Sequence, residues 1–275
     1  MFKDIAIHLT GSEEDATRIS HSATIARSFD AHLTGLQVHE MPEVLAMTDP
    51  AGSAFLQELI AESVERAKTA TSRLKAQFER IGLNHEMRRL DVYPGQVGHV
   101  LATEVRLSDL FVGTRPYGDS TKQHRVEEAV LFDSGRPCLF VPPHHPVPSA
   151  YGTIFVAWKN TREAARTLAE ALPFLQNASS VIVGLVEEGI AGEQTGSAPG
   201  DDVGRYLSRH GIAAEIHLID GWTDIPAALL NEAAKVNADM IVMGAYGHSR
   251  FREWVLSGAT RHLLTNAPVP ILVAH

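Results

Sequence analysis

The sequence contains very little cysteine. Cys138 is the single cysteine among 275 residues, so no disulfide can form within the chain. It lies inside the apolar run 137–141, which is typical of a buried thiol. We therefore expect a buried structural cysteine rather than a reactive one.

Long apolar runs and an excess of positive charge are also missing. No apolar stretch is long enough to span a bilayer, and residues 1–8 enter a polar-interrupted strand without a signal-peptide pattern. The net charge is −9, and no basic cluster offsets it, which argues against binding to nucleic acid or to an anionic membrane. We expect a cytoplasmic protein whose partners are small molecules or other proteins.

What the chain does contain is an internal repeat. With 44% hydrophobic residues it can build ordinary cores, and its length suits two domains. A proline-rich segment, 142–148, separates the copies and is typical of a semi-rigid linker; we place the domains at 1–143 and 150–275, and expect His144 and His145 to be solvated. Three pairs of segments match between the copies: 5–9 with 154–158, 109–112 with 239–242, and 137–141 with 270–274.

Short apolar runs alternate with helical periodicity in both copies, which predicts two doubly wound α/β units with parallel sheets. Ser12 and Asn160, the latter followed by Glu163, are the expected helix caps. We expect the two last strands to pair the copies as a pseudo-dimer, since each would otherwise be an exposed sheet edge. The expected strands are 3–9, 33–39, 85–91, 109–113, 137–141, 152–158, 180–186, 214–219, 239–243 and 269–274. A helical stripe predicted to face the core comprises Phe55, Leu59, Val64, Ala67, Leu74, Phe78 and Ile81.

The most informative stretch is 239–260, where an apolar strand leads into a glycine-containing loop and then a small, hydroxyl-bearing turn. Gly244 and Gly247 permit close approach of the backbone to a ligand and positive φ angles. Residues 257–260 offer unobstructed amides and hydroxyls at the start of a helix, where orphan N–H groups favour an anion. The segment predicts a phosphate cradle, although a plain β–α loop that needs glycine for its turn would show the same two-glycine spacing.

This pattern, G-x2-G-x9 followed by a small or hydroxyl pair and closed by the strand 268–273, resembles the ATP-binding signature of the universal stress protein family. The likeness extends over both halves of the chain. It implies two tandem domains of the adenine nucleotide alpha-hydrolase-like fold, ATP with Mg²⁺ as the ligand, a role in stress response, and a possible association of two chains into a homodimer.

The predicted nucleotide site departs from the family pattern at two places. The family usually ends its motif with glycine and then serine or threonine, whereas this chain has Ser257 before Gly258. The family commonly carries an aspartate after the first strand, where this chain has Lys159, which either contacts phosphates or is a solvated lysine. The predicted nucleotide-binding residues are Ala157, Trp158, Lys159, Met243, Gly244, Gly247, His248, Arg250, Ser257, Gly258, Ala259 and Thr260.

Aromatic and basic side chains add detail to this site. Trp158 and Trp222 either stack on the adenine or pack under their own loops. His248 and Arg250 lie inside the glycine loop and either neutralise phosphate charge or are solvated.

The first copy has lost the glycine pattern. In register with the second copy, Thr114 replaces Gly244 and Tyr117 replaces Gly247, while Pro116 has no N–H to donate. We interpret this copy as degenerate. Its strand ends carry His8, His39, Glu40 and Asp91, which either form a metal or polar-ligand site or, as we favour, are ordinary satisfied polar residues.

Enzymatic activity has weak support in the sequence. No catalytic residue is predicted and no metal site is expected, because no Ser-His-Asp order, zinc motif or lysine-containing P-loop is recognisable. The first hypothesis is a nucleotide-binding regulatory protein with at most slow ATP hydrolysis. The alternative is a module that has lost ATP and binds another small anion or a protein; a hydrolase or adenylating enzyme would need an acid or base that we do not find.

Overall fold

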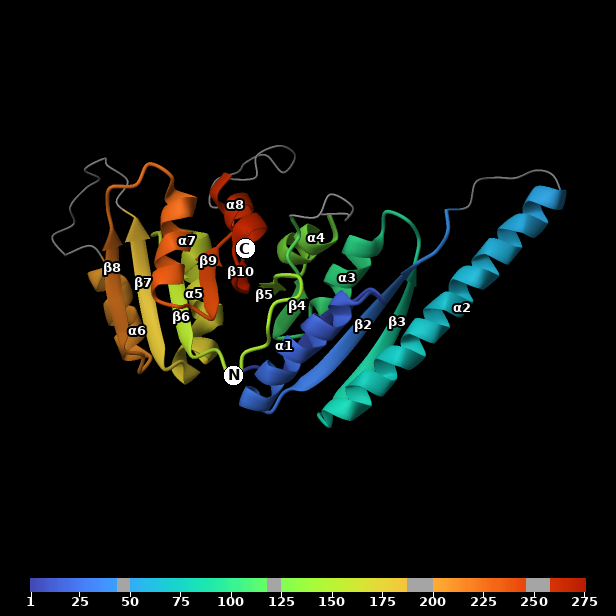
Figure 1. Ribbon diagram of the computed structural model, residues 1–275, viewed down its shortest axis with the longest axis horizontal. Coiled ribbons are helices and arrows are strands. Elements are labelled where there is room, and N and C mark those ends of the chain that lie inside the picture. The colour runs from blue at the N-terminus through green and yellow to red at the C-terminus, as the bar shows by residue number, and fades with distance from the viewer. Residues whose placement is uncertain (44–49, 118–124, 187–199, 246–257) are drawn as a thin grey trace. The chain divides into compact units, whose positions relative to one another are not determined.

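A computed structural model describes residues 1–43, 50–117, 125–186, 200–245 and 258–275. The chain divides into two compact units, one made of 1–114 and 123–136 and the other of 115–122 and 137–275. Each unit is an α/β layer structure (Figure 1). Among the described helices, none combines the length and apolarity that a membrane crossing requires.

In the described residues of the first unit, four parallel strands lie in the order β3-β2-β1-β4. Its strands are β1 (Asp4–Leu9), β2 (His32–Glu40), β3 (His85–Val92) and β4 (Leu110–Thr114). Its helices are α1 (Glu14–Phe29), α2 (Pro50–Ile81), α3 (Val97–Val105) and α4 (Arg125–Asp133).

The described part of the second unit has six strands, in the order β5-β10-β9-β6-β7-β8. Its strands are β5 (Cys138–Val141), β6 (Thr153–Ala157), β7 (Ser180–Val186), β8 (Ala214–Ile219), β9 (Met240–Gly244) and β10 (Ile271–Ala274). Its helices are α5 (Arg162–Asn177), α6 (Asp201–Arg209), α7 (Ile225–Lys235) and α8 (Gly258–Asn266). All neighbouring strands from β10 to β8 run parallel.

Strand β5 comes from the first copy of the repeat but belongs to the second unit, where it runs antiparallel to β10 with Phe140 opposite Ile271. The two last strands therefore cover each other's edges, as the sequence predicts. Cys138 in β5 is fully buried, which confirms the structural thiol. All ten predicted strands are present, with ends displaced by at most two residues.

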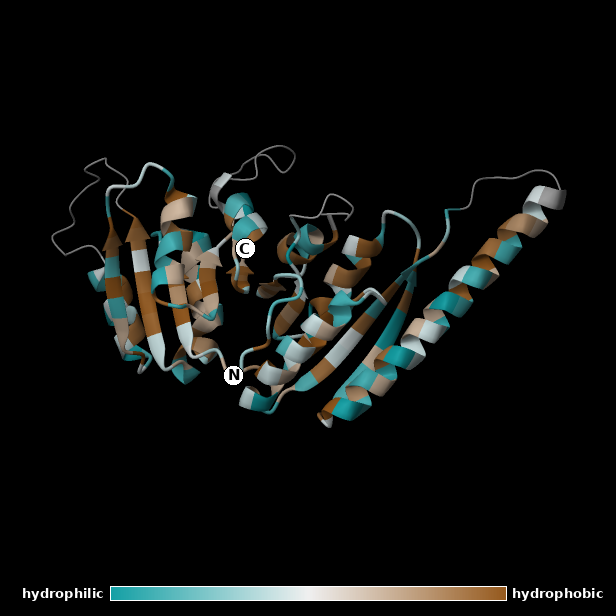
Figure 2. Cartoon of the chain, viewed as in Figure 1, coloured by the Kyte–Doolittle hydropathy of each residue, from teal (hydrophilic) through white to brown (hydrophobic). Residues whose placement is uncertain are grey.

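The apolar strands form the core of both units because parallel strands are covered by helices on both faces. Figure 2 shows this as hydrophobic colour along β6, β7 and β9, with helices of mixed character beside them. The centre of each sheet is fully buried, for example at Ile5 in β1 and at Phe155 in β6.

Equivalent aspartates make the same backbone hydrogen bonds in the two copies. In the first unit, Asp109 accepts hydrogen bonds from the backbone N–H groups of residues 3 and 4, at 2.6 and 3.1 Å. In the second, Asp239 accepts them from residues 152 and 153, at 2.9 and 2.8 Å. The aspartate that precedes β4 or β9 thus ties down the start of the neighbouring first strand, and the matched motif reflects a matched interaction.

Two local predictions were wrong. Helix α5 is capped by Thr161 rather than Asn160, since the Thr161 hydroxyl accepts from the Ala164 amide at 3.2 Å. Ser12 does not cap α1, whose N-cap residue is Glu13 and has no side-chain cap.

The predicted stripe on α2 holds only in part. Ala67, Leu74 and Phe78 are buried, but Phe55 is 55% exposed. Periodicity identifies a helix face, but it does not tell how far the neighbouring sheet extends along the helix.

Candidate functional site

The second unit has its topological switch point between β6 and β9. From β6 the chain proceeds outward through β7 and β8 and then returns to β9 on the other side of β6. Ala157 lies opposite Met243 at the carboxyl ends of these two strands. Ligands of doubly wound sheets bind beyond such a point, so Lys159 and Gly244 follow the two strands that define the candidate site.

Gly244 is required by close packing at this edge. A Cβ atom built on it would lie 2.5 Å from the backbone nitrogen of Ala164 and 2.8 Å from the carbonyl carbon of Glu163. These atoms belong to the first turn of α5 and cannot move aside as a side chain could. Gly244 has no positive φ, so here the glycine permits the approach of a helix start to a strand end.

Side chains of both charges surround this helix start. Lys159 and Arg162 are exposed, and Glu163 is buried. Glu163 is held by an ion pair of 3.1 Å with Arg162. The described edge therefore offers two exposed cations near the amino end of α5, where the helix dipole also favours an anion.

The tryptophans are only partly covered. Trp158 is half-buried, and its backbone N–H donates to the Gly184 carbonyl at 2.9 Å. Trp222 is 42% exposed. Neither side chain is packed fully into the core, so both leave indole surface accessible.

At the equivalent edge of the first unit, protein side chains occupy the space. Thr114, in register with Gly244, accepts a hydrogen bond from Arg18 at 2.9 Å and donates one to Glu14 at 3.0 Å. Arg18 also forms a buried ion pair with Asp15 at 2.5 Å. Where the second unit leaves a glycine, the first has a charged hydrogen-bond network of its own.

The altered glycine loop of the first copy has a packing role. Tyr117 is buried, and the guanidinium of Arg261 from α8 lies 5.2 Å from the centre of its ring. Arg115 donates to the Ala267 carbonyl at 3.2 Å. Arg115 and Tyr117, which fall in the second unit, thus contact residues near the end of the chain.

The strand-end residues of the first unit separate into pairs. His39 pairs with Asp91 at 2.8 Å, His8 lies 3.5 Å from Glu127, and Glu40 is exposed. Within the described parts of the chain, no three His, Cys, Asp or Glu side chains gather in a way that could hold a metal ion.

Burial perturbs two groups near the linker and at the start of the second sheet. It raises the pKa of Tyr151 far above its usual range, and the negative charge of Asp239 adds to the effect. It also lowers the pKa of His145, which is half-buried, so the expected solvation applies to the exposed His144 and not fully to its neighbour.

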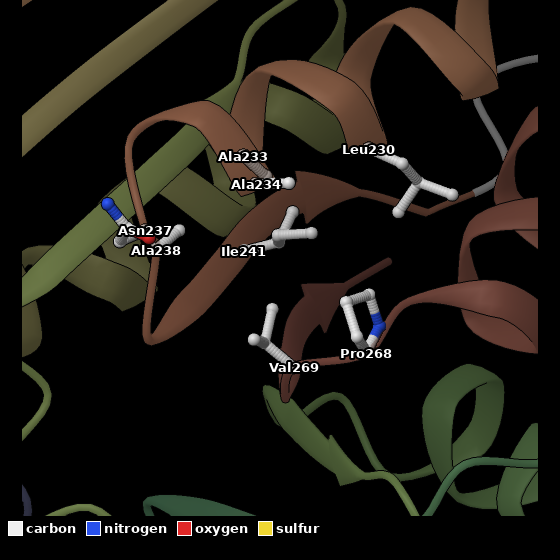
Figure 3. A pocket seen from close by; sticks show the side chains of 8 residues that line it. All are labelled: Leu230, Ala233, Ala234, Asn237, Ala238, Ile241, Pro268 and Val269. Atoms are coloured by element: carbon white, nitrogen blue, oxygen red, sulfur yellow. The ribbon is translucent and has the colours of Figure 1, made fainter.

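A pocket of about 290 Å³ lies at the amino ends of β9 and β10, at the other end of these strands from the predicted nucleotide site. It is formed by side chains of α7, of Ile241 near the start of β9, and of the residues that precede β9 and β10 (Figure 3). Its lining is Leu230, Ala233, Ala234, Asn237, Ala238, Ile241, Pro268 and Val269. Because the lining lies at or before the amino ends of β9 and β10, the pocket is separate from the predicted nucleotide site at their carboxyl ends.

Residues 150–275 match the model of the universal stress protein family. The second unit contains a universal stress protein domain.

Solved structures extend the likeness in fold over the whole chain. A universal stress protein from Archaeoglobus fulgidus DSM 4304 is 19% identical, with a TM-score of 0.77 and coverage of 98% of this chain and 95% of that one. A functionally unknown protein from Pseudomonas aeruginosa PAO1 is 13% identical, with a TM-score of 0.64 and coverage of 99% and 92%. The sequence has no significant match among curated proteins.

The universal stress protein domain brings part of the predicted site together. Ala157, Met243 and Gly244 lie at the adjoining strand ends, with Trp158 and Lys159 directly after β6. Helix α8 begins at Gly258, which is exposed, and includes Ala259 and the buried Thr260. Gly247, His248, Arg250 and Ser257 lie outside the described residues.

Proposed function

We propose that the second unit binds ATP, with Mg²⁺ held through the phosphates, and that the protein is a stress-responsive regulator rather than an efficient enzyme. The observation that carries the proposal is the adjacency of β6 and β9 at the switch point. This adjacency places the loop after β6, which holds Lys159, beside the strand that ends at Gly244.

Binding is confined to the second unit in this proposal. Its strand ends lead into the glycine-containing loop of the family motif, whereas the first unit fills the equivalent edge with Arg18, Asp15 and Thr114. We therefore expect one nucleotide per chain. ATP would act by changing the affinity of the protein for partners, including a second copy of the chain.

Lys159 gives the sharpest test of the ligand. Removing a cation that contacts phosphate costs about 1.5–3 kcal/mol, and less if the contact is solvated. Lys159→Ala should therefore weaken ATP binding while leaving adenosine binding unchanged. Lys75→Ala is the matched control, because it removes the same charge from an exposed lysine on α2 in the first unit.

Calorimetric titration of the full chain with ATP and with adenosine, each at two salt concentrations, separates the possibilities. Equal losses for both ligands would place Lys159 at the base or ribose. No loss for either would remove it from the site. A heat of binding with inorganic phosphate but none with ATP would favour the alternative, a small-anion-binding module that has lost ATP binding.

A further inference from the structure

Three polar side chains of the first unit form a continuous relay that the proposed nucleotide site does not use. The Ser63 hydroxyl oxygen lies 2.9 Å from Nε2 of His39, and Nδ1 of His39 lies 2.8 Å from Oδ1 of Asp91. The residues come from α2, β2 and β3, so the fold and not the sequence order brings them together. This is the connectivity of a nucleophile, a base and an orienting carboxylate.

The proton positions follow from the chemistry of the groups. Burial alone would raise the pKa of Asp91, but hydrogen bonds from His39 and Arg89 outweigh it and hold the pKa below its usual value. The carboxylate is thus ionised at neutral pH and can only accept, so Nδ1 of His39 donates to it. In the neutral imidazole Nε2 is then an acceptor, and the Ser63 hydroxyl donates to it.

The relay is held in place from both sides. His39 and Asp91 are direct partners in the register of β2 and β3. The second carboxylate oxygen of Asp91 accepts from Arg89 at 2.9 Å. His39 is 9% exposed and Ser63 is 8% exposed, so the base and the nucleophile are shielded from most of the solvent while a small part of each remains accessible.

Ser63 differs from the three hydroxyl residues that follow it on α2. The hydroxyls of Thr69, Thr71 and Ser72 each donate to the backbone carbonyl four residues earlier, which is the usual arrangement in a helix. The Ser63 hydroxyl is bonded to His39 instead. Two residues earlier on β2, Gln37 also contacts α2, through Ala67 and Thr71.

We propose that Ser63 is an acyl-accepting site: its hydroxyl oxygen, activated by His39 and positioned through Asp91, is acylated by small activated esters. The oxygen attacks the carbonyl carbon and forms the new C–O bond, while its proton passes to Nε2 of His39. The ester's bond to its alcohol oxygen breaks, and the departing alkoxide takes that proton. The products are acyl-serine and the free alcohol, with Asp91 ionised throughout.

The position of Ser63 sets the outcome of the reaction. It lies in the interior of α2, between Pro50 and Ile81, where backbone N–H groups are used by the helix. Its own amide therefore cannot stabilise an oxyanion. The absence of one such hydrogen-bond donor slows reactions of this kind by about 10²–10³-fold. The site should become acylated once per chain and release the acyl group slowly.

The test uses the full-length protein and p-nitrophenyl acetate. We expect a burst of about one equivalent of p-nitrophenol per chain, an increase of one acetyl group in intact mass, and the acetyl on Ser63 by peptide mapping. Peptide mapping of the wild-type protein is a sufficient test, because acetyl groups on lysines only, with none on Ser63, would overturn the proposal. Ser63→Ala should lose the burst, and Ser72→Ala, the matched control on the same helix, should keep it.

Asp91 is a positioning residue, and its test must exclude a purely structural role. Asp91→Asn should slow acetylation of Ser63 by about 10²-fold or more, since the base loses its orientation and its charge partner. Asp91→Glu, which keeps the carboxylate, should restore part of the rate. Acetylation at the wild-type rate in Asp91→Asn would mean that the relay only attaches α2 to the sheet.

Discussion

Replacing Gly244 by alanine separates its packing role from any role in ligand binding. The added methyl group would lie 2.5 Å from one backbone atom of α5 and 2.8 Å from two others. Because no side chain can rotate away, β9 and α5 must separate. Overpacking of this kind costs about 1–3 kcal/mol.

Gly258→Ala is the matched control for this prediction. Gly258 begins α8 in the same family motif, and a Cβ atom there would meet nothing within 4 Å. It has no positive φ. Alanine is favoured over glycine in a helix by about 0.5–1 kcal/mol, so this variant should be neutral or slightly more stable.

Thermal and urea unfolding of the two variants should therefore diverge. Gly244→Ala should lower the midpoint of the second unit's transition by about 2 °C or more, since 1 kcal/mol shifts the midpoint of a domain of this size by roughly 2–4 °C. Gly258→Ala should not lower it. Wild-type stability in Gly244→Ala would refute the close approach of α5 to the end of β9, and with it the packing explanation for the glycine.

Two further predictions concern interactions that hold the second unit together. Asp239→Ala should lower the free energy of unfolding by about 1.5–3 kcal/mol, because two backbone N–H groups lose a charged acceptor. Asp239→Asn should lower it by less. Equal stability of the alanine variant and the wild type in urea unfolding would exclude this role. The hydrogen bonds that His217 donates to Glu232 and Glu215 raise its pKa, so its stabilisation is complete below the unfolded pKa of about 6.5 and is lost as pH rises through the higher folded value. His217→Gln should accordingly destabilise by about 0.5–1 kcal/mol near pH 6 and by less near pH 9; urea unfolding at the two pH values measures the difference, and an effect that does not change with pH would contradict the assignment.

The strands could be predicted because burial leaves a strong signal in sequence. Runs such as 239–243 are apolar throughout, as parallel strands covered on both faces must be. The repeated aspartates at 109 and 239 mark equivalent strand starts, and the structure shows the same pair of backbone hydrogen bonds at each.

Interactions between distant residues were harder to foresee. The sequence marked Thr114 as the position where the first copy loses its glycine, but it gave no sign that Arg18 would bond to it. His39 and Asp91 were noted as strand-end residues, yet Ser63 was missed because it lies mid-helix, 24 residues away. Only the register of β2 and β3 and the position of α2 above them bring the three together.

Gly244 is compatible with two explanations, the approach of a ligand and the close packing of a helix. Its place after an apolar strand predicted a ligand-approach glycine, and the structure shows a helix backbone at contact distance. Sequence spacing reports that a side chain is excluded there, while the atoms that exclude it become known only from the fold.

Mass spectrometry of the supernatant from the heat-denatured, freshly purified protein, followed by titration of the emptied protein with ATP and Mg²⁺, tests the central proposal most directly. We expect an adenine nucleotide to be released and the emptied protein to bind ATP at about one equivalent per chain. No released nucleotide together with no heat on titration would contradict it. Two equivalents would show that the first unit, despite Arg18 and Thr114, also binds.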